Sequence, residues 1–215
     1  MADQLDNRPV FTIVMGCNGA GKSAWKRENW DRLPERYFDQ DSIAGGIGDW
    51  NSESARARTR EYVDAEIDKA MAARLDFGIE STYSGTPGRA MVERAKAADY
   101  RIEGVYIGTD SPNINAERIE HRVRMNTGHH VDAARLPERY RFSLSNLRKT
   151  AERFDTLEVV DNSTHDEERR PFPTDQLHME NGKTRWRAEP LRSWCEDWLT
   201  RFEMSIADRQ RRANR

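Results

Sequence analysis

Short apolar segments alternate along this chain with longer polar ones. The segments 10–15, 102–107 and 157–161 are apolar and rich in β-branched residues, which is typical of buried strands. Two shorter segments, 37–41 and 77–80, start with aromatic residues and end in acids, and we expect strands there too. Because these strands alternate with helix-length segments, the pattern predicts an α/β fold of three layers, in which helices cover both faces of a parallel sheet.

Helices are expected between the strands. Residues 52–74 predict an amphipathic helix that Asn51 or Ser52 can cap, and residues 133–154 predict another long helix. Two further helix starts, each with an N-cap hydroxyl and Pro at the first helical position, are expected at Thr86-Pro87 and Ser111-Pro112.

The C-terminal part predicts a hairpin and one more helix. Asn181-Gly182 is a strong turn signal for a hairpin over residues 177–187. We expect no separate second domain, because no linker divides the chain; residues 1–215 form one domain that includes 165–215, and the Arg-rich end 209–215 is expected to be a frayed tail. The apolar, core-packing side of the last helix is formed by Leu191, Trp194, Trp198, Leu199 and Phe202.

A phosphate-binding motif follows the first strand. Residues 16–23 fit G-x-x-x-x-G-K-[ST] in full, and 24–31 lack Gly and Pro, so a helix can start at the loop. Backbone N–H groups of such a loop ring a phosphate, and the helix N-terminus adds partial positive charge. The residues expected to bind ATP or GTP are Gly16, Cys17, Asn18, Gly19, Ala20, Gly21, Lys22 and Ser23.

Within this motif, Lys22 is expected to reach the β- and γ-phosphates, and Ser23 is expected to ligate Mg²⁺. The glycine spacing does not fit G-x-G-x-x-G, which argues against a dinucleotide-binding fold.

Composition narrows the class of partner. The 215 residues include 35 basic and 37 acidic ones, for a net charge of −2, so there is no bulk attraction to nucleic acid or to an anionic membrane. Cys17 and Cys195 lie far apart in sequence, which favours a reducing compartment without a disulfide framework. No apolar run approaches the roughly 18 residues of a membrane span, so we expect a soluble, cytoplasmic protein.

Four acids lie at or just past the carboxyl ends of the predicted strands, where ligands bind in such sheets: Asp41, Glu80, Asp110 and Asp161. A kinase needs one carboxylate to orient or deprotonate the acceptor hydroxyl, and often another for the metal. Segment 157–161 is most similar to a Walker B strand. An equally good interpretation is that Asp161 starts the turn Asp161-Asn162-Ser163.

Arg118 and Arg122 are four residues apart on a predicted helix, and neither has an acid three or four residues away. A like-charge pair costs a few tenths of a kcal/mol, and an anion between the two would reverse that cost. A transferring phosphoryl group is such an anion; the alternative is two solvated arginines. His129-His130 is a poor metal site because adjacent side chains diverge and no third ligand is near, so contact of one of them with phosphate or substrate is favoured.

Several ordered motifs resemble the zeta-toxin family of P-loop kinases, over about residues 11–198. Residues 39–44 are similar to N-A-D-x-I-A, and residues 77–85 to F-x-x-E-T-T-L-S-G. Further similarities are E-R-V at 117–119 with R-V at 122–123, R-R-Y-x-R-S-L-x-N-L at 139–147, D-N-S at 161–163, and the C-terminal hairpin of Gram-negative members at 180–186.

The resemblance implies a function and roles for residues. Family members phosphorylate a sugar hydroxyl of UDP-N-acetylglucosamine with ATP and Mg²⁺, and many are neutralised by a proteinaceous antitoxin. By motif match, Asp41 resembles the catalytic base, with Asp39, two residues away on the same strand face, as the alternative. The remaining matches imply acceptor contacts from Glu80, Thr82, Ser84 and His129, and phosphate or ATP contacts from Arg118 and Arg139. The departures from the pattern, at 126–129, Asp132, 137–138 and Phe142, fall in the lid and acceptor region.

Two other functions share parts of this pattern. A metabolic or antibiotic-modifying P-loop kinase would keep the same chemistry without toxicity. A nucleotide-gated interaction protein would bind ATP without transferring its phosphate, but Asp41 with Glu80 and Thr82 argues against it, since a binder needs no acceptor-side carboxylates. A polynucleotide kinase is disfavoured because no basic, aromatic-interleaved stripe is present.

Overall fold

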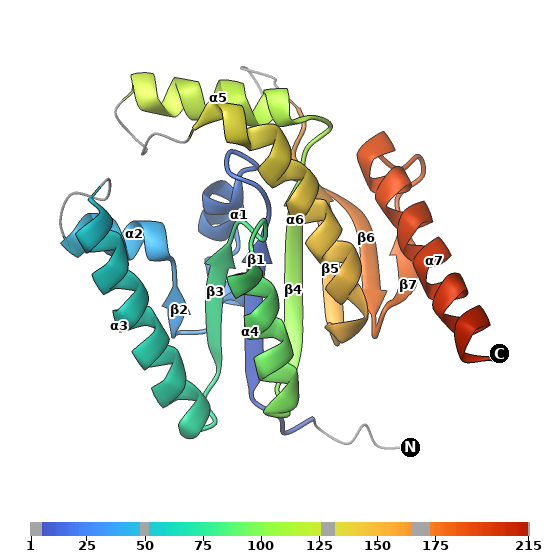
Figure 1. Cartoon of the computed structure of the whole chain (residues 1–215), viewed down its shortest axis with the longest axis horizontal. Coiled ribbons are helices and arrows are strands. Elements are labelled where there is room, and N and C mark those ends of the chain that lie inside the picture. Colours follow the sequence, from blue (N-terminus) through green and yellow to red (C-terminus); the bar gives the residue numbers. More distant parts are fainter. Residues whose placement is uncertain (1–5, 48–51, 126–131, 165–172, 215) are drawn as a thin grey trace.

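The computed structural model describes residues 6–47, 52–125, 132–164 and 173–214. Seven strands form one sheet in the order β2-β3-β1-β4-β5-β6-β7 (Figure 1). The parallel strands are β1 (Val10–Met15), β2 (Tyr37–Phe38), β3 (Phe77–Ser81), β4 (Arg101–Gly108) and β5 (Thr156–Asp161). The antiparallel hairpin β6 (Thr174–Glu180) and β7 (Lys183–Arg187) extends the sheet beyond β5.

Helices cover both faces of the sheet, as the sequence predicts. They are α1 (Lys22–Glu28), α2 (Gln40–Ile47), α3 (Glu53–Ala72), α4 (Thr86–Ala97), α5 (Pro112–Arg124), α6 (Leu136–Thr150) and α7 (Ser193–Ala213). Short 3₁₀ turns lie at Trp30–Arg32, Ala133–Arg135 and Ala151–Arg153. In Figure 1, α4, α6 and α7 cross the near face, and α1 lies behind β1.

The alternation of side chains in β1 shows why both faces need cover. Phe11, Ile13 and Met15 belong to the larger core, which also contains side chains of α3, α4, α6 and α7. Val14 points to the opposite face and packs in a smaller core with Trp25 of α1. Each face therefore buries apolar surface, which is the driving force for the three-layer arrangement.

Several predicted boundaries need correction. The helix expected over 133–154 is an α-helix over Leu136–Thr150 only, with a 3₁₀ turn on each side. Gly85, and not Thr86, occupies the N-cap of α4. The C-terminal hairpin is confirmed, with Asn181 at φ 50° and Gly182 at φ 73°.

The prediction of a frayed tail at 209–215 is also wrong. Helix α7 continues to Ala213, and Arg209 forms an ion pair with Glu152. Among the described residues, none of the helices combines the length and apolarity that crossing a bilayer requires.

Candidate active site

The loop between β1 and α1 has the shape that phosphate binding requires. Gly16, Gly19 and Gly21 all have positive φ, at 145°, 79° and 104°. At Gly19 and Gly21 there is also no room for a side chain: a Cβ would lie 2.5 Å from the Asn115 carbonyl oxygen and 2.0 Å from the Asn162 amide nitrogen. The glycines therefore allow the loop to curl while other elements pack directly against it.

Lys22 starts α1 and is buried, with 8% of its surface exposed. Its Nζ donates to the Gly16 carbonyl oxygen at 2.9 Å and to that of Cys17 at 3.4 Å, so it lies folded over the loop. The same Nζ is 3.8 Å from Oε1 of Glu80. Ser23 follows Lys22 in the first turn of α1 and is exposed.

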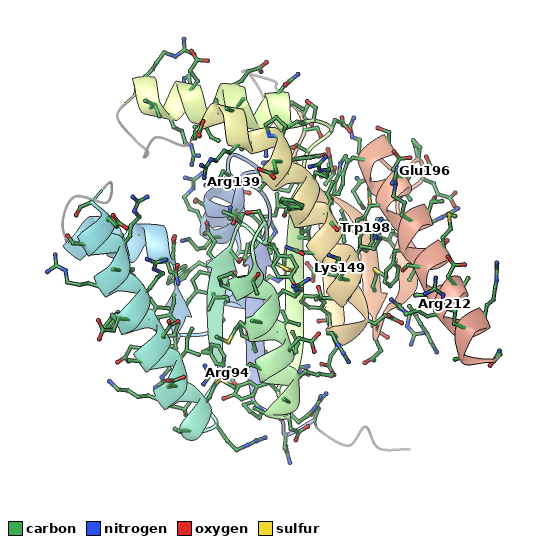
Figure 2. The ribbon with its side chains drawn as sticks, in the orientation of Figure 1. Arg94, Arg139, Lys149, Glu196, Trp198 and Arg212 are labelled. Atoms are coloured by element: carbon green, nitrogen blue, oxygen red, sulfur yellow. The ribbon has the colours of Figure 1, made fainter. Side chains whose placement is uncertain are left out.

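Three side chains hold the loop from outside. The Asn115 amide donates to the Asn18 carbonyl oxygen at 2.9 Å, and Asn162 donates to that of Ala20 at 2.7 Å. Arg139 reaches from α6 and donates to the Asn18 side-chain oxygen at 3.1 Å (Figure 2). The structure therefore brings Arg139 to the loop, and it adds Asn115 and Asn162, which sequence reasoning did not assign to the site.

Cys17 lies in the loop but faces the core. It packs with Ile119 of α5 and Leu136 at the start of α6. Burial raises the pKa of its thiol, so Cys17 stays protonated and contributes packing.

An ionic cluster lies on the other side of Lys22. Glu80 is paired in register with Val14 of β1, so β3 delivers its carboxylate directly beside the phosphate loop. Lys26, one turn after Lys22 on α1, lies 3.6 Å from Glu80 Oε2 and forms a short ion pair with Asp39. Burial alone would lower the pKa of Lys26, but the hydrogen bond to Asp39 and the charges of Asp39 and Glu80 outweigh it and raise this pKa.

Asp41 is not where the sequence pattern predicted it. Strand β2 ends at Phe38, and Asp41 lies in the first turn of α2. Asp39 causes the change of structure, because its Oδ1 accepts a hydrogen bond from the Ser42 backbone N–H at 3.2 Å and its carbonyl oxygen accepts from Ile43. Asp39 and Asp41 therefore do not share a strand face, and the side chain of Asp41 lies outside the described part of the structure.

The expected acceptor contacts Thr82 and Ser84 lie in the loop between β3 and α4. Their hydroxyl oxygens are 3.0 Å apart, and both residues are half-buried. Helix α6 fixes this loop: Ser143 donates to the Thr82 carbonyl oxygen at 2.9 Å, and Asn146 donates to that of Tyr83 at 3.0 Å. His129, the remaining expected contact, lies outside the described residues.

Arg118 and Arg122, the two candidate arginines of α5, have different environments. Arg118 is half-buried, its NH2 group donates to the Thr164 carbonyl oxygen at 3.3 Å, and its buried NH1 group finds no hydrogen-bond partner among the described residues. Burial lowers the pKa of Arg118, although the charges of Asp161 and Glu117 oppose this. Arg122, one turn further on, is exposed.

Asp161 is engaged as a turn residue. Its carboxylate accepts from the Ser163 backbone N–H at 3.1 Å, the Ser163 hydroxyl at 2.5 Å and the Trp194 indole N–H at 2.8 Å, and Arg192 lies 3.3 Å away. Its strand, β5, is separated from β1 by β4. The structure therefore matches the turn interpretation of Asp161, whose carboxylate is 1% exposed and bound by these donors.

The residues around the loop fit Mg²⁺ held largely by a nucleotide. In the described part of the chain no three His, Cys, Asp or Glu side chains gather as a metal site of their own. Mg²⁺ keeps few protein ligands and binds mainly through substrate phosphates. The exposed hydroxyl of Ser23 at the start of α1 is a ligand of the kind required.

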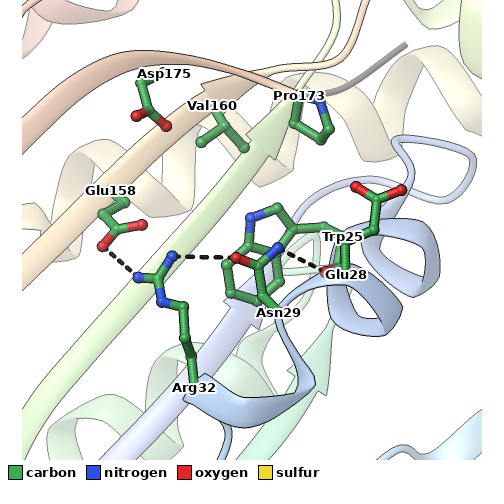
Figure 3. A pocket seen from close by; sticks show the side chains of 8 residues that line it. All are labelled: Trp25, Glu28, Asn29, Arg32, Glu158, Val160, Pro173 and Asp175. Carbon is green, nitrogen blue, oxygen red and sulfur yellow. Dashed lines mark hydrogen bonds and ion pairs between the residues drawn. The ribbon is translucent and has the colours of Figure 1, made fainter. Parts of the chain in front are cut away.

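A cavity of about 320 Å³ lies on another side of α1 (Figure 3). Arg32 crosses it, 2.5 Å from Glu158 and with its guanidinium 5.4 Å from the Trp25 ring centre. The other lining residues are Glu28, Asn29, Val160, Pro173 and Asp175, and no predicted site residue is among them.

Known proteins share this arrangement. The sheet order with a G-x-x-x-x-G-K-S loop between β1 and α1 defines a P-loop kinase fold. The family model for zeta toxins matches residues 2–170, and the chain belongs to the zeta toxin family. An uncharacterised protein of Haemophilus influenzae is 29% identical over 127 residues, which are 59% of this chain and 88% of that protein.

Two solved structures share the fold at low sequence identity. The PezAT toxin–antitoxin system of Streptococcus pneumoniae matches with a TM-score of 0.52 and 16% identity, over 72% of this chain and 69% of the other. The AvrRxo1-ORF1:-ORF2 complex with ATP matches with a TM-score of 0.64 and 8% identity, over 89% of this chain and 64% of the other.

Proposed function

We propose that the protein is an ATP-dependent kinase that phosphorylates a hydroxyl of a nucleotide sugar such as UDP-N-acetylglucosamine and acts as the toxin of a toxin–antitoxin pair. The observation that carries this proposal is the ionic cluster beside the phosphate loop. Glu80 lies 3.8 Å from the Lys22 ammonium, and Lys26 joins Glu80 to Asp39. A carboxylate this close to the phosphate-binding lysine is in a position to orient an acceptor hydroxyl for phosphoryl transfer.

On the donor side, the loop residues provide binding and charge. The loop N–H groups and Lys22 bind the phosphates, and the contacts of the Lys22 ammonium with the Gly16 and Cys17 carbonyl oxygens keep it beside the loop. Ser23 would hold Mg²⁺, which would neutralise part of the negative charge of the phosphates. Arg118 has an unsatisfied buried N–H group with which to bind the equatorial oxygens of the transferring phosphoryl group.

On the acceptor side, Asp41 is the base for the attacking hydroxyl, placed in the first turn of α2, which Asp39 caps. Glu80, Thr82 and Ser84 bind other acceptor groups, and we assign His129 to the same set. Because Ser143 and Asn146 anchor the loop that carries Thr82 and Ser84, the acceptor meets a preorganised surface.

A protein antitoxin is the proposed partner. The family assignment supports it, and so does the fold shared with the PezAT toxin–antitoxin system.

Product masses test the proposal. The protein is incubated with ATP, Mg²⁺ and a panel of nucleotide sugars, sugars and aminoglycosides, with Lys22→Ala as the control. A nucleotide sugar that gains one phosphate only with the wild-type protein supports the proposal. Transfer to another small molecule alone would favour a metabolic or antibiotic-modifying kinase. ATP binding without transfer to any acceptor would favour a nucleotide-gated interaction protein.

A further inference from the structure

The C-terminal segment reaches the edge of the sheet that carries the proposed nucleotide site. The match to the zeta toxin family ends at residue 170, so the hairpin and α7 lie beyond it. Yet Arg192 and Trp194, at the start of α7, both contact the carboxylate of Asp161 at the end of β5. The segment outside the family match therefore contacts a residue inside it.

Trp194 is seated for this contact. The side chain is 6% exposed, and its indole N–H donates to Asp161 Oδ1 at 2.8 Å. Gly108 makes room for the ring, because a Cβ at this position would lie 2.2 Å from it. Asp161 is 1% exposed, so its charge depends on protein donors for stabilisation. Burial, together with the charge of Asp161, raises the pKa of Cys195 to about 12.

The three residues after Asp161 each bind a different part of the site. Asn162 donates to the Ala20 carbonyl oxygen of the phosphate loop at 2.7 Å. The Ser163 hydroxyl accepts from the Asp110 backbone N–H at 2.8 Å, and so holds the turn between β4 and α5. The Thr164 carbonyl oxygen accepts from Arg118 at 3.3 Å. Displacement of Asp161 would therefore disturb the loop and the arginine together.

We propose that Trp194 and Arg192 are positioning residues of the nucleotide site: by fixing Asp161, they hold Asn162 against the phosphate loop and Thr164 against Arg118. This inference rests on the proposed nucleotide site. The effect is indirect, because neither residue is expected to touch ATP. Its physical basis is that removing a donor from a buried carboxylate leaves that charge undersolvated, and the adjoining backbone then shifts to find new partners.

Two matched substitutions on α7 test the inference. Trp194→Phe removes the indole donor and keeps an aromatic ring. Trp198→Phe is the control, since Trp198 is 3% exposed and its indole also donates one hydrogen bond, to the Leu144 carbonyl oxygen of α6 at 3.2 Å and not to Asp161. Calorimetric titration with ATP and Mg²⁺ gives the dissociation constant, and thermal melting of the same samples reports the loss of stability.

Both substitutions should lower the melting temperature, but only Trp194→Phe should weaken ATP binding, by about five- to tenfold. Trp198→Phe should bind ATP within about twofold of wild type. Equal dissociation constants for the two variants would overturn the inference. ATP binding by the wild-type protein is measured first, so failure of the proposed function appears in the parent, whereas failure of this inference appears in the comparison of variants.

Arg192→Met repeats the test at a side chain that is itself exposed, and thermal melting of this variant reports any loss of stability. Combining it with Asn162→Ala asks whether the effect passes through Asn162. The double variant should bind ATP about as weakly as Asn162→Ala alone, because Asn162→Ala has already removed the hydrogen bond between Asn162 and the phosphate loop. Fully additive losses, or no loss with Arg192→Met, would contradict the proposed connection.

Discussion

Replacing Lys26 by Met should weaken both the fold and the proposed chemistry. The Lys26 ammonium lies 3.6 Å from Glu80 and also pairs with Asp39, and the three side chains are 11–17% exposed. At that distance two unit charges attract by about 1 kcal/mol in bulk water and about 5 kcal/mol at an effective dielectric constant of about 20. Since these side chains keep some contact with solvent, we expect Lys26→Met to lower the free energy of unfolding by about 2 kcal/mol.

Urea denaturation measures that free energy, and a transfer assay measures turnover. Two carboxylates without their shared cation should move apart and carry α2 with them, so turnover should fall by about tenfold or more. Lys26→Arg keeps the charge and should restore most of both quantities. Unfolding and turnover of Lys26→Met equal to wild type would show that these ion pairs are screened and contribute nothing.

The pH dependence of the same pair of proteins follows from the raised pKa of Lys26. A cation whose pKa is higher in the folded state than in the unfolded state stabilises the fold below the unfolded pKa, which for Lys26 is about 10.5. The difference in stability between wild type and Lys26→Met should therefore be constant from neutral pH to about pH 9. This difference in stability should shrink as the pH rises through the pKa of Lys26 in the folded protein.

Three further predictions concern other charged residues. Lys22→Ala should abolish transfer while the fold persists, because Lys22 acts on phosphate; thermal melting checks that the variant is folded, and unchanged turnover would remove the loop from the mechanism. Arg118→Ala should lower turnover more than ATP affinity, and Arg122→Ala should do so less, because Arg118 is half-buried and Arg122 is exposed; equal effects would contradict this difference. Burial alone would raise the pKa of Asp155, but hydrogen bonds from the Ile102 backbone N–H, Arg8 and Lys96 outweigh burial and hold this pKa below its usual range. The contribution of the Asp155 carboxylate to folding stability should therefore be lost as the pH falls below about 4. Acid denaturation of Asp155→Asn should lack that loss.

The sequence predicts the fold well because its strongest patterns are local. Strands such as Val10–Met15 need apolar residues on both faces, and helices such as Glu53–Ala72 repeat their buried residues at helical spacing. Strand β2 shows the limit of this reasoning. The aromatic residues at 37 and 38 favour a strand, but the Asp39 side chain caps a helix from the next residue on, which moves Asp41 into α2.

The site is predictable only where its residues lie in a motif. Lys22 and Ser23 belong to the loop motif, whereas Asn115 and Asn162 act through amide groups that bind backbone carbonyl oxygens far away in sequence. An asparagine on a helix or in a turn has many other uses, so spacing alone does not single it out. For Lys26, the i, i+4 spacing from Lys22 is a signal in the sequence, but its meaning depends on the strand order that brings Glu80 alongside.

The most direct test of the proposed function is the transfer rate of Asp41→Asn. Asn is nearly isosteric with Asp and can still form hydrogen bonds, but it cannot accept the proton of the attacking hydroxyl. If Asp41 is the base, the variant should bind ATP normally and lose transfer to the nucleotide sugar by ~10²–10⁴-fold, while Asp39→Asn should mainly destabilise the start of α2. Wild-type transfer by Asp41→Asn would contradict the assignment, and if Asp39→Asn were then inactive the base would be Asp39. Full transfer by both variants would contradict a carboxylate base in this segment altogether.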